Sequence, residues 1–160
     1  MRRKLGLVLG RFQPLHYGHV HIMERAFSEN DEVVICIGSA QKSDPLPIGE
    51  RHRRLVDQMK ALRKTSYKIV DLVDPEPIEI WPTYVKQVCQ ITDETENTVY
   101  RSDRDLTESN LTELQRIGFK VSFIKRISFP YKAPNGVYYQ VSSATDIKRI
   151  HKELSLESFI

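Results

Sequence analysis

"LGLVLGRFQPLHYGH", residues 5–19, joins a short apolar run to a loop and then to two histidines three residues apart. The run Leu5–Leu9 consists mainly of aliphatic residues, as is typical of a strand buried on both faces. Gly10 lets the backbone pass close to a ligand, and Pro14 fixes a loop before a helix that is expected to begin near His16. The stretch therefore predicts a strand, a ligand-binding loop and a helix in immediate succession.

The start of this expected helix combines several features that attract an anion. Its first backbone N–H groups have no partner within a helix, and the helix dipole places partial positive charge there. His16 and His19 lie one helical turn apart and add donors beside Arg11. Because Gly18 carries no side chain, we expect room for a phosphate between the two histidines. Such a cluster suits phosphoryl or nucleotidyl transfer, whereas the motif by itself also allows a helix cap or a metal site.

The remainder of the chain alternates apolar runs with helical patterns. Further short apolar runs, rich in Val and Ile, occupy residues 33–37, 68–73, 98–100 and 121–124. Apolar residues recur at helical spacing near residues 22–27, 55–62, 85–89 and 111–117. This order predicts an α/β fold, a Rossmann-like open parallel sheet of about five strands with helices on both faces. Such a sheet binds its ligand beyond the carboxyl ends of its strands. Loops are expected on that side at residues 43–47, 74–77 and 131–136.

Length and composition indicate one domain over residues 1–160, because the chain has 160 residues and 40% of them are hydrophobic. No stretch approaches the roughly 20 consecutive apolar residues of a membrane helix, and the N-terminal apolar run is too short for a signal peptide. We therefore expect a cytoplasmic protein. Cys36 and Cys89 are far apart in sequence, which favours buried thiols over a disulfide framework or a CxxC metal site. The net charge of +3 is mild and spread along the chain, which favours small anionic ligands over nucleic acid.

A second helix start is expected near the end of the chain, in "SSATDIKR" (residues 142–149). Ser143 or Thr145 can cap this helix, and Asp146 falls in its first turn. Lys148 and Arg149 add positive charge. The segment is therefore expected to bind phosphate groups, although an ordinary capped terminal helix would show the same pattern.

The motif "GRFQPLHYGH" (residues 10–19) resembles the signature of the HxGH nucleotidyltransferase superfamily, and more narrowly that of the archaeal-type nicotinamide mononucleotide adenylyltransferases. Four further stretches resemble this family and follow its order: "ICIGSAQ" (35–41), "GER" (49–51), "IWPTYV" (80–85) and "SSATDIKR". Ordered motifs over nearly the whole chain are far more specific than one short motif. The resemblance implies transfer of AMP from ATP to nicotinamide mononucleotide, giving NAD and pyrophosphate by direct in-line attack.

The resemblance also implies roles for individual residues. His16 would stabilise charge on the α-phosphoryl group, while His19 and Arg11 would position phosphates. Lys148 would follow the leaving pyrophosphate. ATP and its phosphates would further contact Gly10, Phe12, Ser143, Thr145 and Arg149. The mononucleotide or NAD would lie against Gly38, Ser39, Ala40, Asp74 and Trp81. Mg²⁺ would arrive with ATP, mostly bound to water, so no dedicated metal ligands are expected.

Three departures from the family leave open how pyrophosphate is held, how the base or product is recognised, and which acceptor is used. Lys148 stands where the family has an arginine, and "YRSDRDL" (residues 100–106) replaces a small Ser-Gly-Asn-like stretch. The loop between Gln41 and Gly49 is also short for the family. One alternative acceptor is nicotinate mononucleotide. Another is the kind of acceptor used by cytidylyltransferases or by phosphopantetheine-type adenylyltransferases. A third alternative is a module that binds nucleotide without turnover. The resemblance further implies a homo-oligomer, and neither a nucleic-acid nor a membrane partner is expected.

Overall fold

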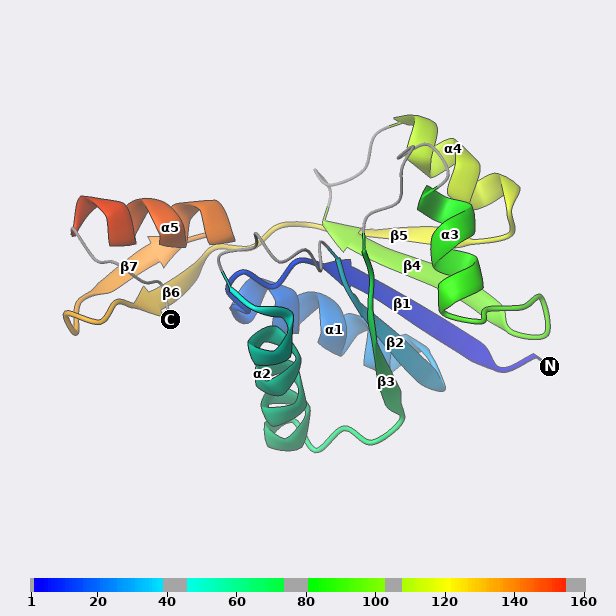
Figure 1. Cartoon of the computed structure of the whole chain (residues 1–160), viewed down its shortest axis with the longest axis horizontal. Helices are drawn as coiled ribbons and strands as arrows, with labels where there is room; N and C mark the ends of the chain where they lie inside the picture. The colour runs from blue at the N-terminus through cyan, green and yellow to red at the C-terminus, as the bar shows by residue number, and fades with distance from the viewer. Residues whose placement is uncertain (1, 39–45, 74–80, 103–107, 155–160) are drawn as a thin grey trace.

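A computed structural model of the chain describes residues 2–38, 46–73, 81–102 and 108–154. Its centre is a sheet of five parallel strands in the order β3-β2-β1-β4-β5 (Figure 1). The strands are β1 (Lys4–Gly10), β2 (Glu32–Ile37), β3 (Tyr67–Asp71), β4 (Glu96–Ser102) and β5 (Lys120–Ile124). The predicted open parallel sheet is confirmed, because each apolar run of the sequence forms one of these strands.

Four helices cover the two faces of the sheet. They are α1 (Tyr17–Glu29), α2 (Ile48–Ala61), α3 (Trp81–Val88) and α4 (Glu108–Arg116). Alternate residues of β1 point to opposite faces, so Val8 packs with Met23 of α1 and Leu55 of α2, whereas the other face forms a second core. In that second core Leu7 packs with Val85 of α3 and Leu114 of α4. The helices on both faces are therefore positioned by the apolar patterns that predicted them.

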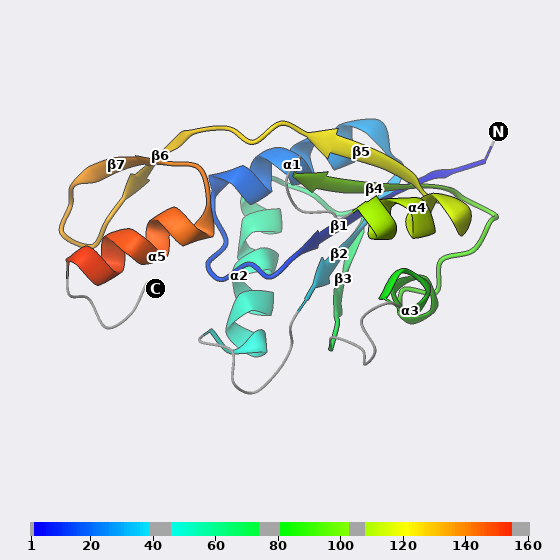
Figure 2. The same ribbon diagram turned by 90° about the horizontal axis from the view of Figure 1, so that it is seen from above.

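A small unit of two strands and one helix follows the sheet in the sequence and lies beside the carboxyl ends of its central strands (Figures 1 and 2). It consists of the antiparallel pair β6 (Phe129–Lys132) and β7 (Tyr138–Val141) and the helix α5 (Ala144–Glu153). Its own core includes Phe129, Val141 and Ile147. The expectation of a loop over residues 131–136 is wrong in part, because Tyr131 and Lys132 belong to β6 and only residues 133–136 form the turn. Strands of four residues are too short to show a clear period.

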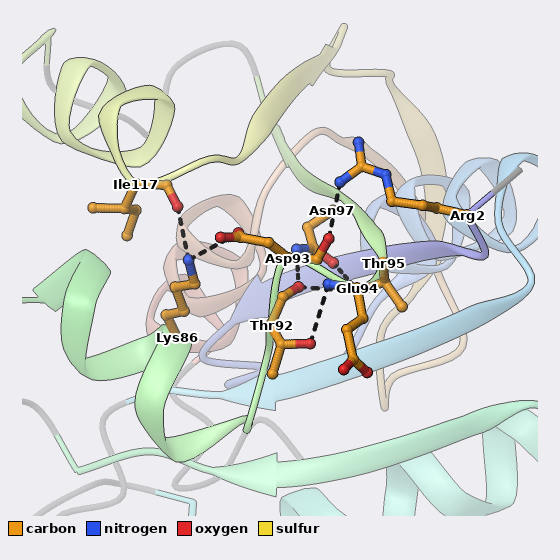
Figure 3. A network of polar contacts seen from close by, with 8 residues as sticks. All are labelled: Arg2, Lys86, Thr92, Asp93, Glu94, Thr95, Asn97 and Ile117. Carbon is orange, nitrogen blue, oxygen red and sulfur yellow. Dashed lines mark hydrogen bonds and ion pairs between the residues drawn. The ribbon is translucent and has the colours of Figure 1, made fainter.

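The amino ends of the strands are closed by polar contacts within the protein (Figure 3). Lys86 Nζ donates to the carbonyl of Ile117 at 2.9 Å and pairs with Asp93 Oδ1 at 3.3 Å, which links α3 to the end of α4. Arg2 Nη1 donates to the carbonyl of Asp93 at 2.9 Å, and Asn97 Nδ2 donates to the carbonyl of Thr92 at 2.9 Å. These groups satisfy one another, so this end of the sheet has a structural role.

The two cysteines are buried thiols, as predicted. Cys36 of β2 and Cys89 lie in the same core, and their Sγ atoms are 3.3 Å apart. Among the described residues, no helix is both long and apolar enough to span a membrane.

Candidate active site

The order of the strands marks the ligand side of the sheet. From β1 the chain proceeds to β2 and β3 on one side, and β4 and β5 lie on the other. Open α/β sheets bind their ligands at such a switch point, beyond the carboxyl ends of the strands. The first turns of α1 and α5 lie side by side at this position in both views (Figures 1 and 2). The two helix starts that the sequence predicted are therefore brought together.

The two histidines of the opening motif cap α1. The Nδ1 atom of His16 accepts a hydrogen bond from the backbone N–H of Gly18 at 3.1 Å, and that of His19 accepts from the N–H of His16 at 3.2 Å. A neutral imidazole carries one hydrogen, so an Nδ1 that accepts leaves the hydrogen on Nε2. Each ring therefore retains an Nε2–H group that can donate to a ligand.

An aromatic stack fixes both rings. The centroids of His16 and His19 are 3.7 Å apart with 25° between the planes, and Phe129 also stacks on His16 at 5.2 Å. Phe12 meets His19 edge-on at 4.8 Å. The expectation of a phosphate between the histidines is wrong, because the rings stack directly on each other. A Cβ on Gly18 would come within 2.9 Å of the His16 ring, so the glycine makes room for the imidazole instead.

Both histidines are neutral at pH 7. Burial, together with the positive charge of Arg126, lowers the pKa of His16 from 6.5 to about 4. Burial lowers the pKa of His19 well below 6.5, and the neighbouring His16 and Arg126 add to the effect. The pair therefore offers hydrogen bonds to an anion, and positive charge must come from the helix dipole and from neighbouring cations.

Arg51 of α2 holds the loop after β1 by a hydrogen bond to its backbone. This arginine of the "GER" stretch is fully buried, and its Nη1 donates to the carbonyls of Arg11 at 3.1 Å and Gly38 at 3.0 Å. The N–H of Gly38 also donates to the carbonyl of Gly10 at 2.8 Å. These bonds fix the ends of β1 and β2 relative to α2. The sequence indicated a packing role for the "GER" stretch, and the hydrogen bonds of Arg51 to two backbone carbonyls agree with that role.

Phe12 lies beneath the histidines. Its side chain is 1% exposed and packs in the core under α1, with the backbone at a φ of 54°. A Cβ on Gly10 would come within 2.8 Å of the Phe12 ring, so this close packing requires the glycine. The Phe12 side chain can therefore act on a ligand only through the ring of His19 that it supports.

The start of α5 is capped as predicted, by Ser143. Its hydroxyl accepts from the N–H of Asp146 at 3.2 Å. The carboxylate of Asp146 in turn accepts from the N–H and the hydroxyl of Ser142 at 2.9 and 3.1 Å, and Arg149 Nη2 lies 3.4 Å from it. The hydrogen bonds from Ser142 lower the pKa of Asp146, which is therefore charged at pH 7. Thr145, in the first turn of α5, and Lys148, in its second turn, are exposed.

Several predicted residues lie outside the described part of the chain. Ser39, Ala40 and Asp74 are among them, as are residues 103–106 of the "YRSDRDL" stretch. Trp81 begins α3, but its side chain is not part of the description. Gly38 is the one residue predicted to contact the mononucleotide whose contacts are described, at the end of β2.

Two residues of this region carried no sequence signal. Phe129 completes the aromatic stack, and Arg126 lies in the segment that joins β5 to β6, where its Nε and Nη2 donate to the hydroxyl of Ser102 at 3.3 Å. Neither belongs to a motif, and both reach the site from more than 100 residues beyond the histidines in the sequence. Within the described ranges, no three His, Cys, Asp or Glu side chains could share a metal ion.

A helix that starts at the switch point of a parallel sheet is typical of α/β proteins that bind nucleotide phosphates. The chain belongs to the cytidylyltransferase-like family, whose model matches residues 7–150. The predicted superfamily is thereby confirmed.

Individual relatives are more specific. The chain is 37% identical to a nicotinamide-nucleotide adenylyltransferase of Thermoplasma acidophilum over 89 residues, which are 53% of this chain and 50% of that protein. The chain thus spans about half the length of the first relatives that it matches. The enzyme of the same name from Thermoplasma volcanium is 28% identical over 159 residues, 91% of this chain and 89% of that protein.

Solved structures show the same fold. A bifunctional NMN adenylyltransferase/ADP ribose pyrophosphatase from Francisella tularensis superposes with a TM-score of 0.71, covering 97% of this chain and 44% of that one. At 15% sequence identity this likeness concerns the fold alone.

Proposed function

We propose that this protein is an adenylyltransferase that transfers AMP from ATP to nicotinamide mononucleotide, giving NAD and pyrophosphate. The observation that carries the proposal is the pair of neutral histidines at the start of α1, next to the start of α5 (Figure 2). Phosphoryl and nucleotidyl transfer depend on positioning and on stabilising negative charge, which is what such donors supply. The relatives named nicotinamide-nucleotide adenylyltransferases support the choice of substrates.

The reaction is a direct displacement at phosphorus. An oxygen of the mononucleotide 5′-phosphate attacks the α-phosphorus of ATP and forms the new P–O bond. The bond from the α-phosphorus to the bridging oxygen breaks, and its electron pair leaves with pyrophosphate. Because the phosphate itself is the nucleophile, the protein contributes donors and cations rather than a covalent intermediate.

The proposed role of each residue follows from its position at the start of α1 or in α5. His16 and His19 donate from Nε2 to the α-phosphoryl group, where negative charge increases in the transition state. Arg11, which is exposed on the loop after β1, contributes positive charge to the same group. Ser143 and Thr145 hold the β- and γ-phosphates at the start of α5, and Lys148 with Arg149 follows the leaving pyrophosphate.

Other parts of the proposal concern the ligands and the assembly. ATP binds as its magnesium complex, with the metal held by phosphate oxygens and water. Ser39, Ala40, Asp74 and Trp81 join Gly38 around the mononucleotide. We further propose a cytoplasmic homo-oligomer whose 160 residues form one domain.

The test is incubation with ATP, Mg²⁺ and a panel of acceptors, with pyrophosphate release as the readout. The panel contains nicotinamide mononucleotide, nicotinate mononucleotide, phosphopantetheine and a phosphorylated alcohol, and CTP replaces ATP in a parallel series. Release only with a nicotinamide or nicotinate mononucleotide supports the proposal. Release with another acceptor or only with CTP reassigns the substrate, and ATP binding without release for any acceptor identifies a sensing module.

A further inference from the structure

The segment between β5 and β6 carries an arginine to the carboxyl edge of the sheet. Arg126 donates from both Nε and Nη2 to the hydroxyl of Ser102, with distances of 3.3 Å. Ser102 is the last residue of β4 and is buried. The guanidinium is therefore attached to the end of a central strand rather than extended into solvent.

The strand register gives the position of this contact relative to the histidine loop. Val8 of β1 is paired with Tyr100 of β4, so Gly10, where the loop begins, is level with Ser102 on the neighbouring strand. Tyr100 and Ser102 are two residues apart and point to the same face of the sheet. Tyr100 packs there with Met23 of α1. The guanidinium thus lies on the face covered by α1, at the edge where α1 begins.

The same segment touches the histidine pair directly. Phe129 follows Arg126 by three residues and stacks on His16 at 5.2 Å. The segment is thereby fixed at one end to Ser102 and at the other to His16. The positive charge of Arg126 also contributes to the lowered pKa values of both histidines, as expected of a cation beside them.

The chemistry of the site calls for such a cation. Two neutral imidazoles supply hydrogen bonds but no charge, while the nucleotide brings several negative charges. A guanidinium carries a delocalised positive charge and presents N–H donors in a planar fork that matches phosphate oxygens. Lys148 on α5 supplies a point charge without this geometry.

We propose that Arg126 is a catalytic residue that binds the phosphates of the nucleotide at the start of α1, and that Ser102 positions it. This inference rests on the proposed function for its reaction, but its first test needs only ATP binding. Ser102 belongs to the "YRSDRDL" stretch, but no motif of the sequence assigns Arg126 to the site.

The experiment measures MgATP binding by calorimetry for the full chain and for two variants that each remove one positive charge. Arg126→Met should weaken ATP binding by roughly tenfold or more, as expected for loss of a charge-assisted hydrogen bond. Lys125→Met is the matched control, because Lys125 is the exposed neighbour, and its ATP affinity should change less than about twofold. A folded Arg126→Met protein that binds ATP as well as the Lys125→Met protein would overturn the proposal.

Two further measurements separate binding from a structural role. Ser102→Ala keeps the arginine but removes its anchor, so ATP binding should weaken by roughly two- to fivefold with an unchanged thermal midpoint. If Ser102→Ala binds ATP as tightly as the wild type, Ser102 has no positioning role. If Arg126→Met also fails to fold, the same result for Ser102→Ala counts against Arg126 as well. Titration of the imidazole NMR signals should show a higher pKa for His16 in Arg126→Met and no change in Lys125→Met.

The outcomes also distinguish this inference from the proposed function. If the wild-type protein binds ATP but releases pyrophosphate with no acceptor, the adenylyltransferase assignment fails, while the calorimetric comparison still decides whether Arg126 binds phosphate. If the wild-type protein is active and Arg126→Met retains both its ATP affinity and its kcat, the reaction stands and Arg126 is excluded from it.

Discussion

The starts of α1 and α5 lie side by side, yet they differ in charge. The first turn of α1 contains no acidic residue, and imidazole nitrogens of His19 and His16 accept from the N–H groups of His16 and Gly18. The first turn of α5 contains Asp146, whose charged carboxylate accepts from Ser142 and pairs with Arg149. One helix start thus keeps its positive potential, while the other is partly neutralised by its own side chain.

This difference separates two tasks in the proposed reaction. Groups at α1 must bind most strongly in the transition state, when charge increases on the α-phosphoryl group. Groups at α5 hold pyrophosphate, which must depart after the transfer. Because Asp146 places a carboxylate at the start of α5, this helix start attracts pyrophosphate less strongly. The exposed Lys148 and Arg149 restore part of the attraction. Changes at α1 should therefore affect kcat more, and changes at α5 should affect ligand affinity more.

The largest effect is expected at His16. His16→Asn preserves a good helix cap but removes the Nε2–H donor, so kcat should fall on the order of 100-fold or more with a smaller change in KM. His21→Asn is the matched control, since His21 lies on the same helix and outside the stack, and its kcat should stay within about twofold. Steady-state kinetics of pyrophosphate release gives both values. A His16→Asn enzyme with near-normal kcat would refute the assignment.

Acidification should reveal the buried state of the same histidine. The pKa of His16 is about 4 in the folded protein and 6.5 ordinarily, so between these values the unfolded chain binds more protons. Its contribution to stability is therefore fully present above pH 6.5 and is lost as the pH falls toward 4. From pH 7 to pH 5 the free energy of unfolding should drop by about 2 kcal/mol from this residue.

Denaturant titrations at the two pH values measure this drop. The drop should be smaller in His16→Asn, which has no group to protonate at that position. Equal losses in the wild-type and variant proteins would show that His16 titrates normally in the folded state.

A moderate effect is expected at Lys148 on α5. Lys148→Ala should weaken ATP binding by roughly tenfold and mononucleotide binding much less, whereas Lys148→Arg should bind ATP at least as well as the wild type. Lys152→Ala is the control, because Lys152 is exposed in the last turn of the same helix. Calorimetry with each ligand checks the order. Equal ATP affinity for Lys148→Ala and Lys152→Ala would assign the triphosphate to other cations.

The two helix starts also show what local sequence can predict. The strand, the loop and the capped helix of residues 5–19 follow from neighbouring residues, and so does the cap of α5 by Ser143. The stacking of Phe129 on His16 was missed because it joins β6 to a segment more than 100 residues away in the sequence. Arg126 was missed for the same reason, since its anchor Ser102 is 24 residues away in the sequence. Contacts between distant segments set the site's geometry, and a single sequence does not display them.

The smallest effect is expected at Asp146, and it tests the comparison of the two helices most directly. Asp146→Asn keeps an oxygen that can accept from Ser142 but removes the negative charge at the start of α5. A charge at a helix start is worth roughly 0.3–1 kcal/mol, so inorganic pyrophosphate should bind about two- to fivefold more tightly to the variant. The gain should shrink at high salt, because it arises from a partly exposed charge. Glu153→Gln removes the same charge from the other end of α5 and should leave the affinity unchanged. Weaker pyrophosphate binding to Asp146→Asn would mean that the carboxylate organises the phosphate site, and that the two helix starts differ in structure rather than in potential.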